Sequence, residues 1–505
     1  MDKQRSASDP QPPSPLGETL SVAIIGGGIA GLALAAGLIK NPHLDVHVYE
    51  ADSNIRDYGA GLTLHRNGIE ALGYIGPEVR KAYLDAAISI AEEENEETAT
   101  EVYMACGEHA GEVVAELGRA KGRKSLSRAD LIRALLTLIP KERIHFGKRL
   151  TKIKSYNVKL REIRFTFEKD AQIYTANCLF GADGINSIVR KYILGAGHPA
   201  ANPKNTDSWY MYRVQIPMKV ARDYGVDDRL TRTVPILLGP HGHLNCIPLN
   251  KGTRLSVGIA LRNLKYQSYI KYSSVSDPPL NRSDLPSIPS IIASVYHPIT
   301  HPLLNLLSNP PIDGGKDIEV QIFAQPLQDL DRIDTYLRKD ERQPITILGD
   351  AAHAALPFAG QGAAQAFEDA AILSYLFSMV KTRRHAFYAM AAYEQVRLER
   401  TQTVREAARR YGLMYAWADN DGVRGEKRGV ANFLRHYGKW MNEVDIKAVA
   451  QEAKSKFWEM ATDNVDEDTD RSESPRSRRR TITGGKRTEL YKKSVSSWWS
   501  ASESS

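Results

Sequence analysis

Three short glycine-containing segments hold the residues whose types and spacing could do chemistry: residues 26–31, 181–184 and 349–353. In the first, glycines let the backbone approach a phosphate, and the N-terminus of a following helix offers free N–H groups and a partial positive charge. Acidic residues that can accept hydrogen bonds from sugar hydroxyls lie within the second and third segments, Asp183 and Asp350, and 19 residues after the first, Glu50. Together the segments predict a dinucleotide pocket and therefore redox chemistry.

The elements around the first segment are those that such a pocket needs. Residues 21–25 are an apolar, β-branched run typical of a buried parallel strand, and residues 29–39 predict a helix packed on the sheet. Residues 45–49 predict a second strand, with Glu50 at its end. Strand, glycines, helix, strand and acid follow in the order of a Rossmann-type dinucleotide-binding domain.

The glycines and the acid of this segment have distinct roles. Gly26 permits the tight turn, Gly28 admits a pyrophosphate where a Cβ would stand, and Gly31 lets helix and strand pack closely. Glu50 lies 19 residues after Gly31, a spacing that suits a carboxylate bound to a ribose. An acid here favours FAD or NAD over NADP. A glycine-rich turn without a ligand is the alternative, and the order of the elements argues against it.

The second segment is less specific. Residues 177–182 predict a strand end and residues 185–193 a helix, joined by Asp183 and Gly184. Asp183 could accept a hydrogen bond from a cofactor, and Arg190 could lie near its phosphates. When the segment is taken alone, an ordinary Asp-Gly turn explains it better than a cofactor contact does.

The third segment follows a predicted buried strand over residues 343–348 and places Asp350 where it can bind a sugar-alcohol hydroxyl. The loop 357–362 then leads into a helix predicted over 363–380, whose first N–H groups can stabilise negative charge on a reduced cofactor ring. Three further ionisable residues are expected to be structural, with the histidine packed or hydrogen-bonded to the backbone rather than an acid–base group: His353, Glu368 and Asp369.

These segments resemble the FAD-binding signatures of single-component aromatic-ring flavoprotein monooxygenases, the para-hydroxybenzoate hydroxylase and salicylate hydroxylase group. Residues 349–370 (GDAAHAALPFAGQGAAQAFEDA) give the most specific match, supported by residues 181–190, by residues 59–62 with Asn67, and by residues 127–131. The resemblance covers about residues 20–415 and is closest to salicylate-hydroxylase-like enzymes, many from fungal secondary metabolism. It implies these FAD-binding residues: Gly26, Gly28, Gly31, Glu50, Gly61, Arg128, Asp183, Asp350, Pro357, Gly360, Gly362 and Ala363.

The resemblance also implies a reaction. NADPH or NADH reduces FAD and leaves, molecular oxygen gives a flavin C4a-hydroperoxide, and one oxygen atom passes to an aromatic or phenolic small molecule, with no metal. Two positions depart from the family: Ile247 stands where a tyrosine often precedes Pro248, and Ala354 replaces a proline. The first departure removes a tyrosine that could contact the substrate ring.

Arg213 is the candidate for the substrate side. Residues 208–216 alternate and are rich in aromatic side chains, which predicts a strand. Arg213 resembles a family arginine that faces the flavin and holds an acidic or phenolic substrate, and a cation there would stabilise a phenolate. We take Arg213 and Tyr212 as the catalytic candidates, with a surface ion pair as the alternative for Arg213. Residues 273–309 either cover the active site or are an insertion.

The expected fold class is α/β, with a Rossmann-type FAD-binding domain interleaved with a β-sheet substrate domain, followed by C-terminal helices. The expected boundaries are 20–80, 120–205 and 325–400 for the FAD-binding domain and 81–119 and 206–324 for the substrate domain. Helices expected over 386–415 and 430–460 pack on the FAD-binding domain or form a dimer contact. Residues 1–19 and the basic tail 461–505 are expected to be disordered.

Composition sets the remaining bounds. The chain has 505 residues, 42% hydrophobic, with a net charge of +7, and its three cysteines, Cys106, Cys178 and Cys246, lack metal-ligand spacing. We expect a cytoplasmic monomer or homodimer that binds no nucleic acid. We also expect it to span no membrane, because no apolar run is long enough to cross a bilayer. Two other functions stay open: a flavin-dependent epoxidase or dehydrogenase of an alkene or isoprenoid, and a non-catalytic flavin-binding sensor.

Overall fold

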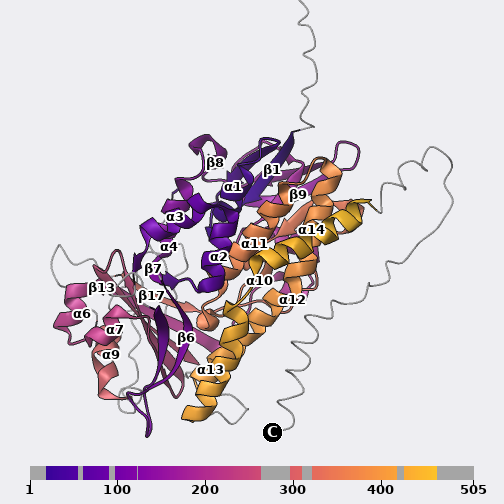
Figure 1. Cartoon of the computed structure of the whole chain (residues 1–505). Coiled ribbons are helices and arrows are strands. Elements are labelled where there is room, and N and C mark those ends of the chain that lie inside the picture. The colour runs from indigo at the N-terminus through magenta and orange to yellow at the C-terminus, as the bar shows by residue number, and fades with distance from the viewer. Residues whose placement is uncertain are drawn as a thin grey trace, which may run out of the picture. The chain divides into compact units, whose positions relative to one another are not determined.

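The computed structural model describes residues 19–54, 61–89, 97–121, 123–262, 296–309, 321–417 and 426–462 (Figure 1). The chain divides into two compact units, and the fold described here is that of the first, Met1–Glu459. The expectations for residues 1–18, for Gly59, for residues 273–295 and for the tail from residue 463 lie outside the described residues.

A parallel sheet forms the first layer of the described fold. Its five strands lie in the order β18 (Ile345–Ile347), β12 (Cys178–Gly181), β1 (Leu20–Ile25), β2 (Leu44–Tyr49) and β8 (Ile144–His145). The predicted strands are therefore confirmed, and their apolar runs are buried as expected for parallel strands. In register, Ile25 pairs with Tyr49 and with Gly181, and Gly181 pairs in turn with Ile347 of β18, so the three segments leave the sheet at the same edge.

Three helices pack on one another beside this layer (Figure 1): α1 (Ile29–Leu38), α2 (Arg66–Ile75) and α11 (Gly362–Phe377). Of these, α1 packs on β1 and β2. α1 is rich in alanine, glycine and leucine and almost wholly buried, because it lies between the sheet and α11. The long helix α12 (Arg383–Tyr415) then packs on α11.

A second, larger sheet carries most of the remaining strands that the structure describes. Its seven strands lie in the order β17 (Gln321–Pro326), β13 (Trp209–Pro217), β16 (Arg254–Arg262), β15 (Gly242–Leu249), β14 (Ile236–Gly239), β5 (Glu97–Met104) and β6 (Val113–Lys121). Both faces are covered: the core with Tyr212 and Val214 includes α9 (His301–Ser308), and the core with Trp209 and Met211 includes α12 and α13 (Lys427–Asn442). The residues that follow an alternating pattern in β13 thus point alternately to two different cores.

Smaller elements complete the described residues. Strands β3 (Gly61–Thr63), β7 (Lys124–Ser127) and β4 (Ile88–Ser89) form one small sheet, and β9 (Leu150–Asn157), β10 (Glu162–Phe167) and β11 (Tyr174–Ala176) form another. The remaining α-helices are α3 (Pro77–Ala86), α4 (Arg128–Leu136), α5 (Ile188–Leu194), α6 (Met218–Asp223), α7 (Asp228–Arg232), α10 (Asp350–His353) and α14 (Ile446–Thr462). No described helix is both long and apolar enough to cross a membrane.

Two sequence expectations about helices need correction. The helix predicted from residue 185 begins at Ile188, because the side chain of Ser187 caps it. The helical pattern predicted over 430–460 is two helices, α13 and α14, since the chain leaves the helical conformation at Glu443 after α13 ends at Asn442.

Candidate functional site

The three glycine segments meet at the carboxyl edge of the parallel sheet. Gly26 has a φ of +108°, and a Cβ built there would stand 2.2 Å from the carbonyl oxygen of Ala182 in the second segment. A Cβ built at Gly349, in the third segment, would stand 2.7 Å from the Cβ of Ala30 in the first. Close approach of backbones therefore explains why glycine occupies these turns.

The first segment forms a cradle at the start of α1. Gly28 precedes the helix in an extended conformation, and no side chain caps the N-terminus. A Cβ built at Gly28 would meet only the guanidinium of Arg128, 3.5 Å from Nη2, whereas one built at Gly31 would stand 2.0 Å from the carbonyl oxygen of Gly26. Uncapped N–H groups and an exposed arginine converge on one open place, which fits a pyrophosphate.

Glu50 and Asp350 supply carboxylates on either side of this cradle. Glu50 is fixed by two backbone donors, the N–H of Gly27 at 2.6 Å from Oε2 and the N–H of Asp52 at 2.8 Å from Oε1. Asp350 is exposed at the start of α10, and none of the described residues forms a hydrogen bond or ion pair with its carboxylate. Both positions fit the hydroxyl groups of a bound dinucleotide.

The loop 357–362, called the flavin loop below, presents backbone rather than side chains. Pro357, Gly360 and Gly362 are exposed, α11 begins at Gly362 without a side-chain cap, and a Cβ built at Gly362 would meet nothing within 4 Å. The loop is anchored by Phe358, whose ring lies 4.5 Å from that of Trp209 on β13. It therefore brings the helix N-terminus next to the second sheet.

The two charged residues of the second segment lie differently from the sequence expectation. The carboxylate of Asp183 accepts hydrogen bonds from the backbone N–H groups of Ile188 at 2.7 Å and Val189 at 3.2 Å, so it caps α5. Arg190 is fully buried, and its guanidinium donates to backbone carbonyls. The expectation that Arg190 lies near phosphates is wrong, because its side chain points into the core. A role of Asp183 toward FAD stays a prediction.

Arg213 lies on the face of the second sheet that the flavin loop contacts. It pairs in register with Gly258, which pairs in turn with Asn245, so the three residues lie side by side on one face. Arg213 and Asn245 are half-buried, and none of the described residues forms a hydrogen bond or ion pair with either side chain. Burial lowers the pKa of Arg213 to about 10, which leaves the guanidinium charged at neutral pH. The alternative of a surface ion pair is not found among the described residues.

Tyr212 does not share this face. Successive side chains of a strand point to opposite faces, and Tyr212 belongs to the other core, with Val214 and Ile216. Tyr212 and Arg213 therefore lie on opposite faces of the sheet, and a catalytic role of Tyr212 stays a prediction. The described end of the segment 273–309, helix α9, also packs on the Tyr212 face, so it does not cover Arg213.

Two residues near Arg213 were missed by the sequence reasoning. Asn245 is one, and His243 on the same face is the other; its ring lies 5.2 Å from that of Phe358 and 5.0 Å from that of Tyr415. Burial lowers the pKa of His243 to about 3, so the imidazole is neutral at physiological pH. The alternating pattern of residues 242–249 predicts that Asn245 and His243 share one face of a strand. The pattern does not predict that this strand lies in the same sheet as Arg213, which depends on the strand order.

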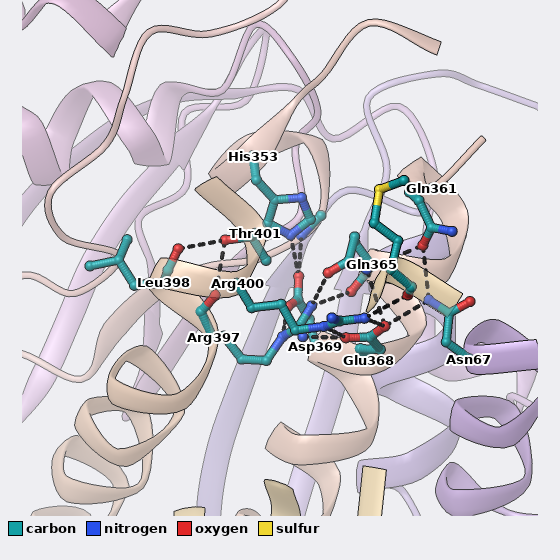
Figure 2. Close-up of polar contacts among 12 residues, drawn as sticks. Asn67, His353, Gln361, Gln365, Glu368, Asp369, Arg397, Leu398, Arg400 and Thr401 are labelled. Carbon is teal, nitrogen blue, oxygen red and sulfur yellow. Dashed lines mark hydrogen bonds and ion pairs between the residues drawn. The ribbon is translucent and has the colours of Figure 1, made fainter. Parts of the chain in front are cut away.

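The ionisable residues of α11 form a buried network (Figure 2). Glu368 accepts from Arg397 and, at 2.7 Å, from Nε of Arg400, while Asp369 accepts from Nε of Arg397 at 2.8 Å. Nε2 of His353 lies 2.6 Å from Oδ2 of Asp369. The structural roles expected for Glu368 and Asp369 are confirmed. His353 is packed as expected, but the bond that its ring forms among the described residues is to the carboxylate of Asp369 and not to the backbone. Burial raises the pKa of both carboxyl groups, but the neighbouring cations outweigh it and hold each pKa at about 2.

Fold and site together define a protein with a Rossmann-like dinucleotide-binding domain joined to a second sheet. Residues 312–408 match the FAD binding domain family, and residues 24–62 match the NAD(P)-binding Rossmann-like domain family. The chain is 34% identical to a 6-methylsalicylate 1-monooxygenase of Aspergillus terreus over 80% of this chain and 86% of that protein. It is 26% identical to a salicylate hydroxylase of Pseudomonas putida over 87% of this chain and 96% of that protein.

A solved structure agrees with these matches. A salicylate hydroxylase substrate complex superposes with a TM-score of 0.69 at 26% identity and covers 86% of this chain and 98% of the other. The chain therefore belongs to the family of FAD-dependent aromatic monooxygenases that includes salicylate hydroxylase. It is an FAD-dependent monooxygenase that consumes NAD(P)H, as the sequence resemblance implied.

Proposed function

We propose that this monooxygenase hydroxylates an aromatic ring that bears an anionic group, such as a salicylate, and that Arg213 holds that group. The single observation that carries the proposal is a half-buried guanidinium without a partner among the described residues, on the face that the flavin loop contacts. Removing a cation from water without a counter-anion is costly, so a ligand anion would complete the site. The named substrates of the two relatives above belong to the same chemical class.

We assign the cofactor to the cradle at the carboxyl edge of the parallel sheet. FAD, when bound, supplies the redox chemistry that activates oxygen at the expense of NAD(P)H. The start of α1 and Arg128 would hold its pyrophosphate, Glu50 its ribose, and Asp350 its ribityl chain. The flavin loop would place the N-terminus of α11 at the ring, where N–H groups favour negative charge.

The chain's own residues then act on the substrate by orientation and exclusion of water. Arg213 would fix the anionic group by charge-assisted hydrogen bonds and stabilise a phenolate, which raises the nucleophilicity of the ring. Asn245, across Gly258, offers a donor and an acceptor to a second substituent. The contact between the rings of Phe358 and Trp209 covers part of the same face with apolar side chains, which would exclude water from it.

The test compares the wild type with Arg213→Gln on a panel of phenols and salicylates. Mass spectrometry should find products that gain one oxygen atom, with or without loss of the carboxyl group. The variant should keep its FAD and raise KM for anionic substrates by roughly 10- to 150-fold, the equivalent of a charge-assisted contact of about 1.5–3 kcal/mol. More NAD(P)H should be oxidised per product formed, because a misplaced ring is not hydroxylated.

The matched control is Arg229→Gln. Arg229 is an exposed arginine that pairs with Asp227 at 2.7 Å, and its loss should leave KM unchanged. Equal KM values in Arg213→Gln and the wild type, with an unchanged ratio of product to NAD(P)H, would contradict the assignment of Arg213. If none of the compounds on the panel stimulates NAD(P)H oxidation by the wild type, the proposed substrate class is contradicted.

We also propose a cytoplasmic location and a monomeric or homodimeric state. All three cysteines are buried free thiols, which suits a reducing compartment. Cell fractionation and light scattering test these two points separately. The domain division proposed from the sequence, with residues 20–80, 120–205 and 325–400 binding FAD, is tested by limited proteolysis with and without the cofactor.

A further inference from the structure

Gln361 is the fifth of the six residues of the flavin loop, and its side chain is buried. Its neighbours Gly360 and Gly362 are exposed, whereas Gln361 is only 3% exposed. Figure 2 shows the amide oxygen of Gln361 bonded to the side chain of Asn67. A long polar side chain buried inside a loop of small residues implies that its amide has specific partners.

Those partners come from two helices that are remote in sequence. Nε2 of Gln361 donates to Oδ1 of Asn442 at 2.7 Å, where α13 ends, 81 residues further along the chain. Oε1 of Gln361 accepts from Nδ2 of Asn67, on α2, at 2.9 Å. The loop is thus held between the helix that follows β3 and the helix at the C-terminal side of the fold.

The contacts close into a ring through the buried carboxylate of α11. Nδ2 of Asn67 also donates to Oε1 of Glu368 at 2.8 Å, and Arg400 binds both oxygens of Glu368. Nη2 of Arg400 donates in turn to the carbonyl oxygen of Met441 at 3.0 Å, the residue before Asn442. Gln361, Asn67 and Arg400 each bind two members of this ring, so each side chain is held from two sides. Oδ1 of Asn67 is buried without a hydrogen-bond partner among the described residues.

We propose that Asn442 and Gln361 form a clamp by which α13 positions the flavin loop, so that both are positioning residues for the monooxygenase reaction. The proposal rests on the proposed assignment of the flavin loop to FAD. Neither side chain touches the open side of the cradle, and the clamp acts by fixing where the N-terminus of α11 and Pro357 stand. A loop that can shift misplaces the cofactor ring relative to Arg213, and a shift of about 1 Å can cost on the order of 100-fold in rate.

The test uses Gln361→Ala, Asn442→Ala and the double variant in the full chain. Asn442→Ala should weaken FAD binding by about 2- to 10-fold, the effect of one buried neutral hydrogen bond. Gln361→Ala should weaken it by at least as much, because this change also removes the hydrogen bond from Asn67. Each single variant should also raise the hydrogen peroxide released per NAD(P)H oxidised while KM for the substrate stays near the wild-type value. The double variant should be no worse than Gln361→Ala, because that change already removes the contact with Asn442.

Asn432→Ala is the matched control. Asn432 is an exposed asparagine on the same helix, bonded only weakly to Arg435 among the described residues, and its loss should change neither FAD affinity nor peroxide release. Thermal unfolding and circular dichroism of each variant report its folding. Additive losses in the double variant, or folded single variants with wild-type FAD affinity and peroxide release, would overturn the clamp. A wild type that binds no FAD or makes no hydroxylated product would instead refute the proposed function.

Discussion

Replacement of Glu368 by glutamine tests the buried network through its charge, with almost no change of shape. Glu368 is fully buried, and its two oxygens accept from Arg397, Arg400 and Asn67. Glutamine would leave two buried guanidinium groups with Asp369 as the one carboxylate of this network. Breaking a buried pair by removing one charge costs about 3–5 kcal/mol, so the free energy of unfolding should fall by that amount at neutral pH.

The effect should depend on pH in a defined direction. Arg400 and Arg397 outweigh the effect of burial and hold the folded-state pKa of Glu368 at about 2, below its ordinary value of 4.5. A group with a lowered folded-state pKa stabilises the fold fully above its unfolded-state pKa, and this contribution is lost as the pH falls toward the folded-state value. The difference in unfolding free energy between wild type and Glu368→Gln should therefore shrink between pH 6 and pH 3.

Urea unfolding followed by circular dichroism, at one fixed FAD concentration, measures both effects. Glu399→Gln is the control, because Glu399 pairs with Arg332 at 2.7 Å while both side chains are more than half exposed. A surface pair contributes about 0–1 kcal/mol, so this variant should be nearly as stable as the wild type. Equal losses in the two variants, or a difference for Glu368→Gln that does not change with pH, would refute the reasoning.

Two further variants test the FAD cradle. Gly28→Val should purify without flavin absorbance, because a branched side chain would fill the space between α1 and Arg128; retained yellow colour at full stoichiometry would contradict the assignment. Asp350→Ala should weaken FAD binding by roughly 10- to 150-fold through loss of a hydrogen bond to a charged acceptor, as measured by flavin titration. Unchanged affinity would show that Asp350 does not bind the ribityl chain.

The sequence predicted the FAD-binding part well because its signals are local. A strand, a glycine turn and a helix follow one another within residues 20–38, and the ends of parallel strands share one edge of the sheet. The convergence of Gly26 with Ala182, and of Gly349 with Ala30, follows from this rule alone. The expectation that Glu368 is structural held for a similar reason, since a carboxylate in the second turn of a buried helix needs a cation nearby.

The substrate side was harder, because its geometry depends on pairings between distant strands. Alternation along β13 separates Tyr212 from Arg213, but nothing in the local pattern indicates which of the two faces meets the flavin loop. Asn245 and Arg213 lie on the same face because each pairs with Gly258 of β16. This strand order cannot be predicted from any one segment of the sequence. The Gln361–Asn442 contact spans 81 residues, so local propensity and motif spacing carry no signal for it.

The arginines of this chain show how burial and pairing together separate structure from function. Arg397 and Arg400 are buried with carboxylates that match their charge, and Arg190 is buried with its guanidinium bound to backbone carbonyls. The charge and the hydrogen-bond donors of these three arginines are matched by groups of the chain itself, so no ligand is needed to complete them. Arg213 is half-buried with a lowered pKa and has no such partner among the described residues. An anion that binds there would raise the pKa of Arg213 again and recover the cost of desolvation, which supports the proposal that Arg213 holds a charged substrate.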